Sequence, residues 1–119
     1  MSTWVSPRLV VQIVTRNGSS FKNGAYDSRP CLVKSVDVRS STAVLKPMDS
    51  NESLSSVPID LIDPVRPEKK DNAKVVSGDY VNSIGLLLSI DGTDGIFRIE
   101  GHSDFKILGL NDLVKYIKE

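Results

Sequence analysis

Residues 74–91 read KVVSGDYVNSIGLLLSID, and this stretch decides the fold. The apolar pair Val75–Val76 lies just before Gly78, and a second apolar run, Leu86–Leu88, follows Gly85. A tight arc between two strands requires a residue that tolerates positive φ, and close packing inside a very small barrel requires a residue without Cβ. The stretch therefore predicts a strand, a glycine-bounded arc and a second apolar strand.

Short runs rich in β-branched residues occur along the whole chain. We expect strands at 10–14, 31–36, 42–45 and 54–57 in the first half, and at 74–76, 85–90, 95–99 and 105–108 in the second. Turn residues separate the runs; Asp91 to Gly95, which includes Gly92, is typical of a hairpin turn. No window carries a sustained helical stripe of apolar residues, so the sequence predicts an all-β protein.

The order of these runs is repeated after about 50 residues, which indicates two units of one design. The predicted division is a first small barrel at 1–64, a linker at 65–72 and a second barrel at 73–119. Each unit is expected to close with a single helical turn and a short last strand, at 57–62 and 108–114. Pro64, just before the linker, and Pro67 within it stiffen this connection, and the charged residues of the linker keep it solvated.

The charge balance of the chain bears on its partners. Fifteen basic residues stand against fifteen acidic ones. Autonomous nucleic-acid binders usually have a basic excess, because phosphate neutralisation supplies most of their affinity. Tight RNA or DNA binding by this chain alone is therefore disfavoured, and protein partners are favoured.

Nothing in the sequence indicates catalysis, a cofactor or a metal. Cys31 has no second cysteine for a disulfide, and with His102 it cannot form a structural zinc site. The two residues fall in different units, and neither lies in a nucleophile motif. No apolar run approaches the length of a membrane span, and no secretory h-region follows the N-terminus. We therefore expect an intracellular protein that is not an enzyme.

The second half of the chain carries a specific resemblance. Residues 85–96, GLLLSIDGTDGI, followed by Lys106-Ile107-Leu108, give the strongest match. Through them nearly the whole chain resembles the last two KOW modules in the large subunit of the eukaryotic transcription elongation factor DSIF, which is related to bacterial NusG. Trp4-Val5 and Asp63 to Lys69 also resemble this family. In the first unit, Pro30-Cys31 stands where the family's glycine is expected, and the preceding arc, from Arg16 to Arg29, is long and polar.

The resemblance implies two tandem SH3-like barrels of the KOW type, from the C-terminal end of a much longer protein. It implies a nuclear, monomeric module of the RNA polymerase II elongation complex that contacts polymerase, nascent RNA or other elongation and processing factors. Binding to the small zinc-containing subunit of the factor is not carried over, because the domain responsible for it is expected to be absent.

Aromatic residues near basic ones are candidates for contact with a partner or RNA. The candidates are Phe21, Lys22, Tyr26, Arg29 and Lys34 in the first unit, and Lys74, Tyr80, Arg98 and Lys106 in the second. Gly78, Gly85, Gly92 and Gly95 are expected to serve the fold. Phe97, Phe105 and Tyr116 are expected in the core or at the barrel end, because strand alternation turns one face inward.

Two alternatives remain open. An autonomous RNA-binding KOW module, of the ribosomal or splicing type, is disfavoured because neither half of the chain has a marked basic excess. A methyl-lysine reader requires several aromatics that converge on one mouth, and Tyr80, Phe97, Phe105 and Tyr116 are its only candidates.

Overall fold

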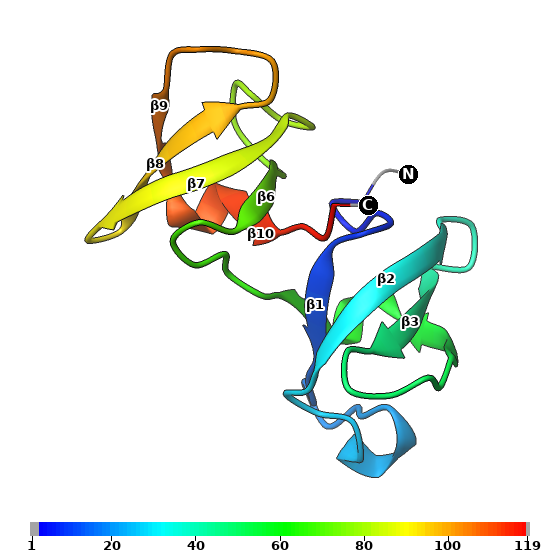
Figure 1. Cartoon of the computed structure of the whole chain (residues 1–119). Helices are drawn as coiled ribbons and strands as arrows, with labels where there is room; N and C mark the ends of the chain where they lie inside the picture. The colour runs from blue at the N-terminus through cyan, green and yellow to red at the C-terminus, as the bar shows by residue number, and fades with distance from the viewer. Residues whose placement is uncertain (1–2, 119) are drawn as a thin grey trace. The chain divides into compact units, whose positions relative to one another are not determined.

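The computed structural model describes residues 3–118, which divide into two compact units between Val65 and Arg66 (Figure 1). Each unit contains one five-stranded antiparallel sheet. Residues 3–118 contain no α-helix, and their three helical segments are single 3-10 turns. The all-β prediction is therefore confirmed, and the two sheets are consistent with small SH3-like barrels. No helix in the described part of the chain is long and apolar enough to cross a membrane.

The strands of unit 1 follow the predicted runs closely. They are β1 (Val10–Ile13), β2 (Pro30–Asp37), β3 (Thr42–Pro47), β4 (Leu54–Pro58) and β5 (Ile62–Pro64). One 3-10 turn, η1 (Lys22–Gly24), lies between β1 and β2, and a second, η2 (Ile59–Leu61), joins β4 to β5. The strand order in the sheet is β4-β3-β2-β1-β5.

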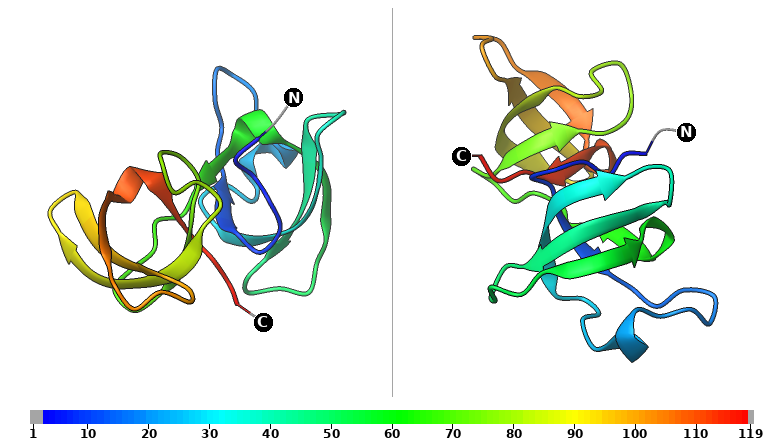
Figure 2. Two further views of the ribbon diagram at one scale, coloured as in Figure 1. Left: turned by 90° about the horizontal axis from the view of Figure 1, so that it is seen from above. Right: turned by 90° about the vertical axis from the view of Figure 1, so that its right-hand side faces the viewer.

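Unit 2 repeats this arrangement. Its strands are β6 (Asn72–Val75), β7 (Ile84–Asp91), β8 (Asp94–Ile99), β9 (Lys106–Gly109) and β10 (Leu113–Lys115), and η3 (Leu110–Asp112) joins the last two. The order β10-β6-β7-β8-β9 matches that of unit 1, strand for strand. Even the register shift on the second strand recurs, between Val33 and Ser35 in β2 and between Leu87 and Ser89 in β7. Within each unit the strands curl around their own core (Figure 2).

The cores are wholly apolar among the described residues. Inward side chains alternate with outward ones, as along β3 and β6, because successive residues of a strand point to opposite faces. In unit 2 the core consists of Ala73, Val75, Leu87, Phe97, Leu110 and Leu113. The closing turns contribute Leu61 and Leu110, as the apolar ends of the two units predict.

One expectation about the core is wrong. Phe97 is fully buried and Tyr116 is partly buried, but 60% of Phe105 is exposed. The reason is that β9 begins at Lys106, so Phe105 lies in the preceding loop, outside the strand alternation. Because Phe97 is inside the core, it cannot contribute to an aromatic cage on the surface.

The segment predicted as a linker is bonded within each unit. Val65 donates its backbone N–H to the carbonyl oxygen of Val10, 3.1 Å away. Further on, Lys70 donates to Leu87 and Leu87 donates to Asp71, at 2.7 and 2.9 Å. Pro67 is buried.

Candidate interaction site

The segment between β1 and β2, residues 14–29, is the longest connection in unit 1, and we call it the arc. It projects from the ends of β1 and β2 and carries η1 (Figure 1). Arg16 and Ser19 exchange backbone hydrogen bonds of 2.9 and 2.8 Å around Asn17 and Gly18, both of which have positive φ. Such paired positive φ values are favourable for Asn-Gly, so this tight turn is encoded locally.

The arc returns along β1 and is fixed to it. Ser28 donates its backbone N–H to the carbonyl oxygen of Ile13 at 2.9 Å, and the Thr15 hydroxyl lies 2.6 Å from Oδ2 of Asp27. At its start, Arg16 donates to the carbonyl oxygen of Asp60 at 2.7 Å and pairs with Asp63 at 2.5 Å. A long polar connection is therefore held in one conformation by contacts at both of its ends.

Four predicted contact residues of unit 1 lie together on the arc. The rings of Phe21 and Tyr26 are tilted at 50°, with centroids 6.3 Å apart. The guanidinium carbon of Arg29 lies 5.1 Å from the centroid of the Tyr26 ring, and Nζ of Lys22 lies 5.8 Å from that of Phe21. These distances are within cation–π range. We call Phe21, Lys22, Tyr26 and Arg29 the arc cluster.

Two carboxylates on the β3–β4 loop hold the arc cluster in place. The hydroxyl of Tyr26 donates to Oε2 of Glu52 at 2.8 Å, and Nη2 of Arg29 pairs with Oδ1 of Asp49 at 2.9 Å. The hydrogen bond to Glu52 raises the pKa of Tyr26, and the hydrogen bond from Arg29 lowers the pKa of Asp49. The phenol therefore stays protonated as a donor, and Asp49 stays ionised.

The chemistry of the arc cluster suits a mixed polar and aromatic partner. Lys22 and Tyr26 line a shallow hollow of about 460 Å³ with Glu52, Ser53 and two further residues of the β4 side. Because Arg29 pairs with Asp49 and Lys22 lines the same hollow as Glu52, the four formal charges cancel. The arrangement can stack on a planar group or bind side chains, and it lacks the basic excess that phosphate binding requires.

The remaining sequence candidates lie on β2 and in unit 2. Lys34 is exposed on β2, where the register shifts. In unit 2, Nζ of Lys106 lies 5.4 Å from the centroid of the Tyr80 ring and 3.4 Å from Oδ2 of Asp104. Lys74, on β6, is partly buried. The second unit thus has a smaller aromatic–basic pair where the first has four side chains.

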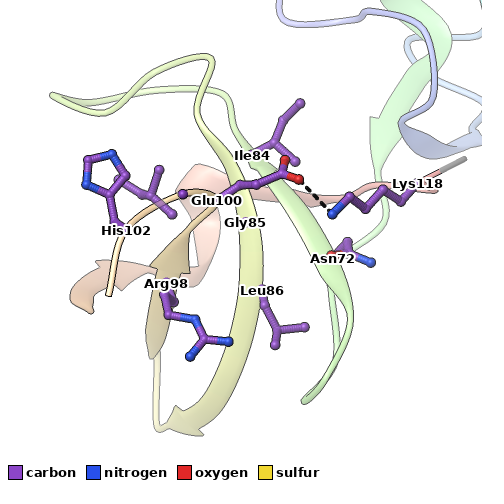
Figure 3. A pocket seen from close by; sticks show the side chains of 10 residues that line it. Asn72, Ile84, Gly85, Leu86, Arg98, Glu100, His102 and Lys118 are labelled. Atoms are coloured by element: carbon purple, nitrogen blue, oxygen red, sulfur yellow. Dashed lines mark ion pairs between the residues drawn. The ribbon is translucent and has the colours of Figure 1, made fainter. Parts of the chain in front are cut away.

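Arg98 lines a separate pocket of about 260 Å³ in unit 2 (Figure 3). His102 and Glu100 line the same pocket, and Glu100 forms a 2.7 Å ion pair with Lys118, drawn as a dashed line in Figure 3. The Arg98 side chain lies along the pocket wall, away from this ion pair (Figure 3).

The four glycines expected to serve the fold have different local environments. Gly78 has φ +90° in the connection between β6 and β7, and Gly92 has φ +62° in the two-residue turn between β7 and β8. Gly85 has no positive φ, but a Cβ there would lie 2.1 Å from the carbonyl oxygen of Arg98. A Cβ at Gly95 would lie 2.7 Å from Cδ1 of Leu87.

Sequence reasoning missed the anchors of the arc cluster. Glu52 and Asp49 lie 26 and 20 residues from their partners, in a loop of ordinary polar composition. It also missed exposed Ile107, which the strand pattern gave no reason to single out. Only the β2–β3–β4 pairing brings the anchors to the arc, and no local pattern encodes that.

Comparison with known proteins finds a family model that matches the second unit. Residues 65–116 match the family model described as transcription elongation factor SPT5, seventh KOW domain. The chain is 29% identical to SPT5 homolog 1 of Arabidopsis thaliana over 115 residues, which are 97% of this chain and 10% of that protein. It is 36% identical to SPT5 homolog 2 of the same plant over 55 residues, 46% of this chain and 6% of that protein. The chain therefore spans about a tenth or less of the length of these relatives, and the resemblance seen in the sequence is confirmed.

Proposed function

Since residues 65–116 match the model of an SPT5 KOW domain, we propose that this chain is a non-catalytic interaction module of a transcription elongation factor. In this proposal it acts in the nucleus as a monomer with two tandem barrels. It docks on the RNA polymerase II elongation complex or on elongation and processing factors, and its contact with nascent RNA is weak.

The single observation that supports a docking role is the arc cluster. Aromatic and arginine side chains are the types that contribute most to binding energy at protein interfaces. Tyr26 and Arg29 are already held by Glu52 and Asp49, so binding costs less conformational entropy than it would on a mobile loop. The length of the arc has a purpose in this account, because it presents these groups beyond the sheet.

The charge of the arc cluster supports a protein partner over a nucleic acid. Its two cations are matched by Asp49 and Glu52, and the whole chain has no net charge. A surface that binds phosphate by counterion release needs unmatched basic groups. Contact with RNA is therefore limited to stacking on an exposed ring.

The state of Cys31 supports a role without covalent chemistry. Its side chain is fully buried, and burial raises the pKa of the thiol. The thiolate is the reactive form of cysteine, so a buried thiol with a raised pKa is a poor nucleophile.

The proposal is tested by retention of the chain on an assembled RNA polymerase II elongation complex. We expect the variant with Phe21→Ala, Tyr26→Ala and Arg29→Ala to bind at least tenfold more weakly, with a nearly unchanged melting temperature. The matched control is Val38→Ala with Arg39→Ala, which removes an exposed apolar side chain and a cation at the β2–β3 turn. Equal retention of both variants, or a large loss of stability in the arc variant, would overturn the proposed role of the arc cluster.

A titration with single-stranded RNA at 50 and 200 mM salt distinguishes the alternative. We expect weak binding with a shallow salt dependence, because few phosphates are neutralised. Micromolar affinity with a steep loss at the higher salt would contradict the proposal and favour an autonomous RNA-binding module.

A further inference from the structure

The edge strands β4 and β9 occupy the same place in the two sheets but differ in form. In unit 1, the pairing of β3 with β4 shifts register between Ala43 and Leu45, so β4 carries a bulge at Ser55 and Ser56. Ser56 has φ +57° there. A bulge with polar residues is a common protection of an edge strand against pairing with another chain.

The edge of unit 2 lacks this protection. All four residues of β9 pair with β8 in continuous register, from Lys106 opposite Phe97 to Gly109 opposite Asp94. At the position of the serine bulge stands Ile107, opposite Ile96. Among residues 3–118, no strand pairs with the outer edge of β9.

The register turns the backbone of Ile107 toward the open edge. Leu110 donates its N–H to Thr93 across the same ladder at 2.9 Å. Because hydrogen-bonded and non-hydrogen-bonded pairs alternate in an antiparallel ladder, Leu108 and Lys106 face β8. The N–H and C=O of Ile107, between them, point away from β8.

The side chains around this edge are also exposed and apolar. The exposed fractions are 69% for Ile107, 60% for Phe105 and 36% for Tyr80. Tyr80 and Ile107 line one groove of about 300 Å³, together with Leu108. An open, regular edge flanked by apolar side chains has both elements of strand addition: backbone groups for pairing and pockets for alternate side chains.

We propose that β9 binds an extended peptide segment of a partner protein as an added strand. The segment has alternating apolar side chains, which fit over Tyr80 and Ile107, and at least one Lys or Arg. The basic residue follows from charge: Asp79 and Asp112 line the groove, and no lysine or arginine is among the described residues that line it. Asp104 is paired with Lys106 of β9. This surface lies on unit 2 and is independent of the arc cluster.

A second copy of the chain is not the occupant. Stable protein–protein interfaces bury about 1,200–2,000 Å² in total. β9 is four residues long, and a pair of such strands buries far less than this. The edge therefore suits a short linear segment, bound weakly.

The test uses the full ¹⁵N-labelled chain and the acetylated, amidated peptide Lys-Ile-Thr-Ile-Thr-Ile-Lys, followed by amide NMR. We expect saturable shifts confined to β9 and to residues 78–81, with slower hydrogen exchange at Ile107. A peptide of the same composition with its three isoleucines adjacent, and one with aspartates in place of the lysines, should bind at least fivefold more weakly. No saturable shift, shifts elsewhere, or equal binding of all three peptides would overturn the proposal.

Two further comparisons separate strand pairing from simple apolar contact. Ile107→Ser should weaken binding at least tenfold, whereas Ile90→Ser, at a 42% exposed isoleucine of β7, should leave it unchanged. One peptide is N-methylated at its isoleucine amides and a second at its threonine amides, so that opposite edges of the strand are blocked. One of these two methylated peptides should lose binding and the other should keep it. Unchanged binding of both methylated peptides would contradict strand addition. Concentration-dependent dimerisation through β9 would also contradict the proposal.

Discussion

The two units share one sheet but differ in the connection between their first two strands. This connection has sixteen residues in unit 1, 14–29, and eight in unit 2, 76–83. The strand order, the register shift on the second strand and the closing 3-10 turn are the same in both. The difference teaches that the sheet can keep its form while the arc and the edge strand change, and these are the parts that present side chains to partners.

The cores of the two units also reach one packing by opposite choices. Cys31 and Gly85 hold the same position on the second strand, and Leu45 and Phe97 hold the same position on the third. Unit 1 has the larger residue, Cys31, on its second strand and the smaller one, Leu45, on its third. In unit 2 the second strand has the smaller residue, Gly85, and the third has the larger one, Phe97. A Cβ at Gly85 would lie 2.8 Å from Cζ of Phe97, so the glycine accommodates the ring.

The largest expected effect is that of adding a methyl group at Gly85. We expect Gly85→Ala to destabilise unit 2 by about 3 kcal/mol, because the new Cβ overlaps the backbone of Arg98 and the ring of Phe97. Urea unfolding followed by amide NMR, with resonances of each unit scored separately, measures this. Adding Phe97→Leu should restore only part of the loss, since the contact with the Arg98 carbonyl remains. If the free energy of unfolding of unit 2 in Gly85→Ala stays within about 0.5 kcal/mol of that in the unsubstituted chain, the packing account is contradicted.

The converse change at Cys31 should have a smaller effect. Cys31→Gly removes a buried side chain and adds a flexible residue to a strand, so we expect unit 1 to lose about 2 kcal/mol. The same unfolding measurement applies, with unit 2 as the internal reference. A loss confined to unit 2, or no loss in unit 1, would show that the two positions are not equivalent.

The contacts of Arg16 at the start of the arc should contribute less still to the stability of unit 1. Arg16 contacts Asp60 and Asp63, but its side chain is 44% exposed, so solvent weakens the ion pair. We expect Arg16→Ala to cost about 0.5 kcal/mol and to raise amide exchange at residues 17–20. Lys46→Ala, outside the arc, is the control, and equal exchange in both variants would rule out the anchoring role.

The smallest effect is a shift in the titration of Tyr26. The pKa of its phenol is raised by the hydrogen bond to Glu52, so Glu52→Gln should let Tyr26 ionise at lower pH. A group with a raised folded pKa stabilises the arc below its unfolded pKa, about 10, and this contribution is lost as the pH rises through the folded value. Tyrosine absorbance and ring NMR signals measure the titration of Tyr26, and the Tyr26→Phe variant assigns the transition to this residue. An unchanged titration in the Gln variant would mean that this anchor is absent in solution.

Much of the fold could be predicted from the sequence because its signals are local. The β-branched runs and turn pairs such as Asn17-Gly18 define strands and turns without knowledge of distant residues. Phe105 was misplaced because a strand that begins one residue later removes it from the alternation. The anchors Asp49 and Glu52 could not be predicted, since their meeting with Arg29 and Tyr26 depends on tertiary pairing. The open edge at Ile107 was missed for the same reason.

The measurement that tests the central claim most directly is photo-crosslinking on an assembled RNA polymerase II elongation complex. A benzophenone amino acid replaces Phe21 in the arc of the full chain, and in a matched protein it replaces Val38 at the β2–β3 turn. The account predicts crosslinks to a protein subunit from position 21 and few from position 38. Equal yields from both positions, or crosslinks from position 38 alone, would contradict it.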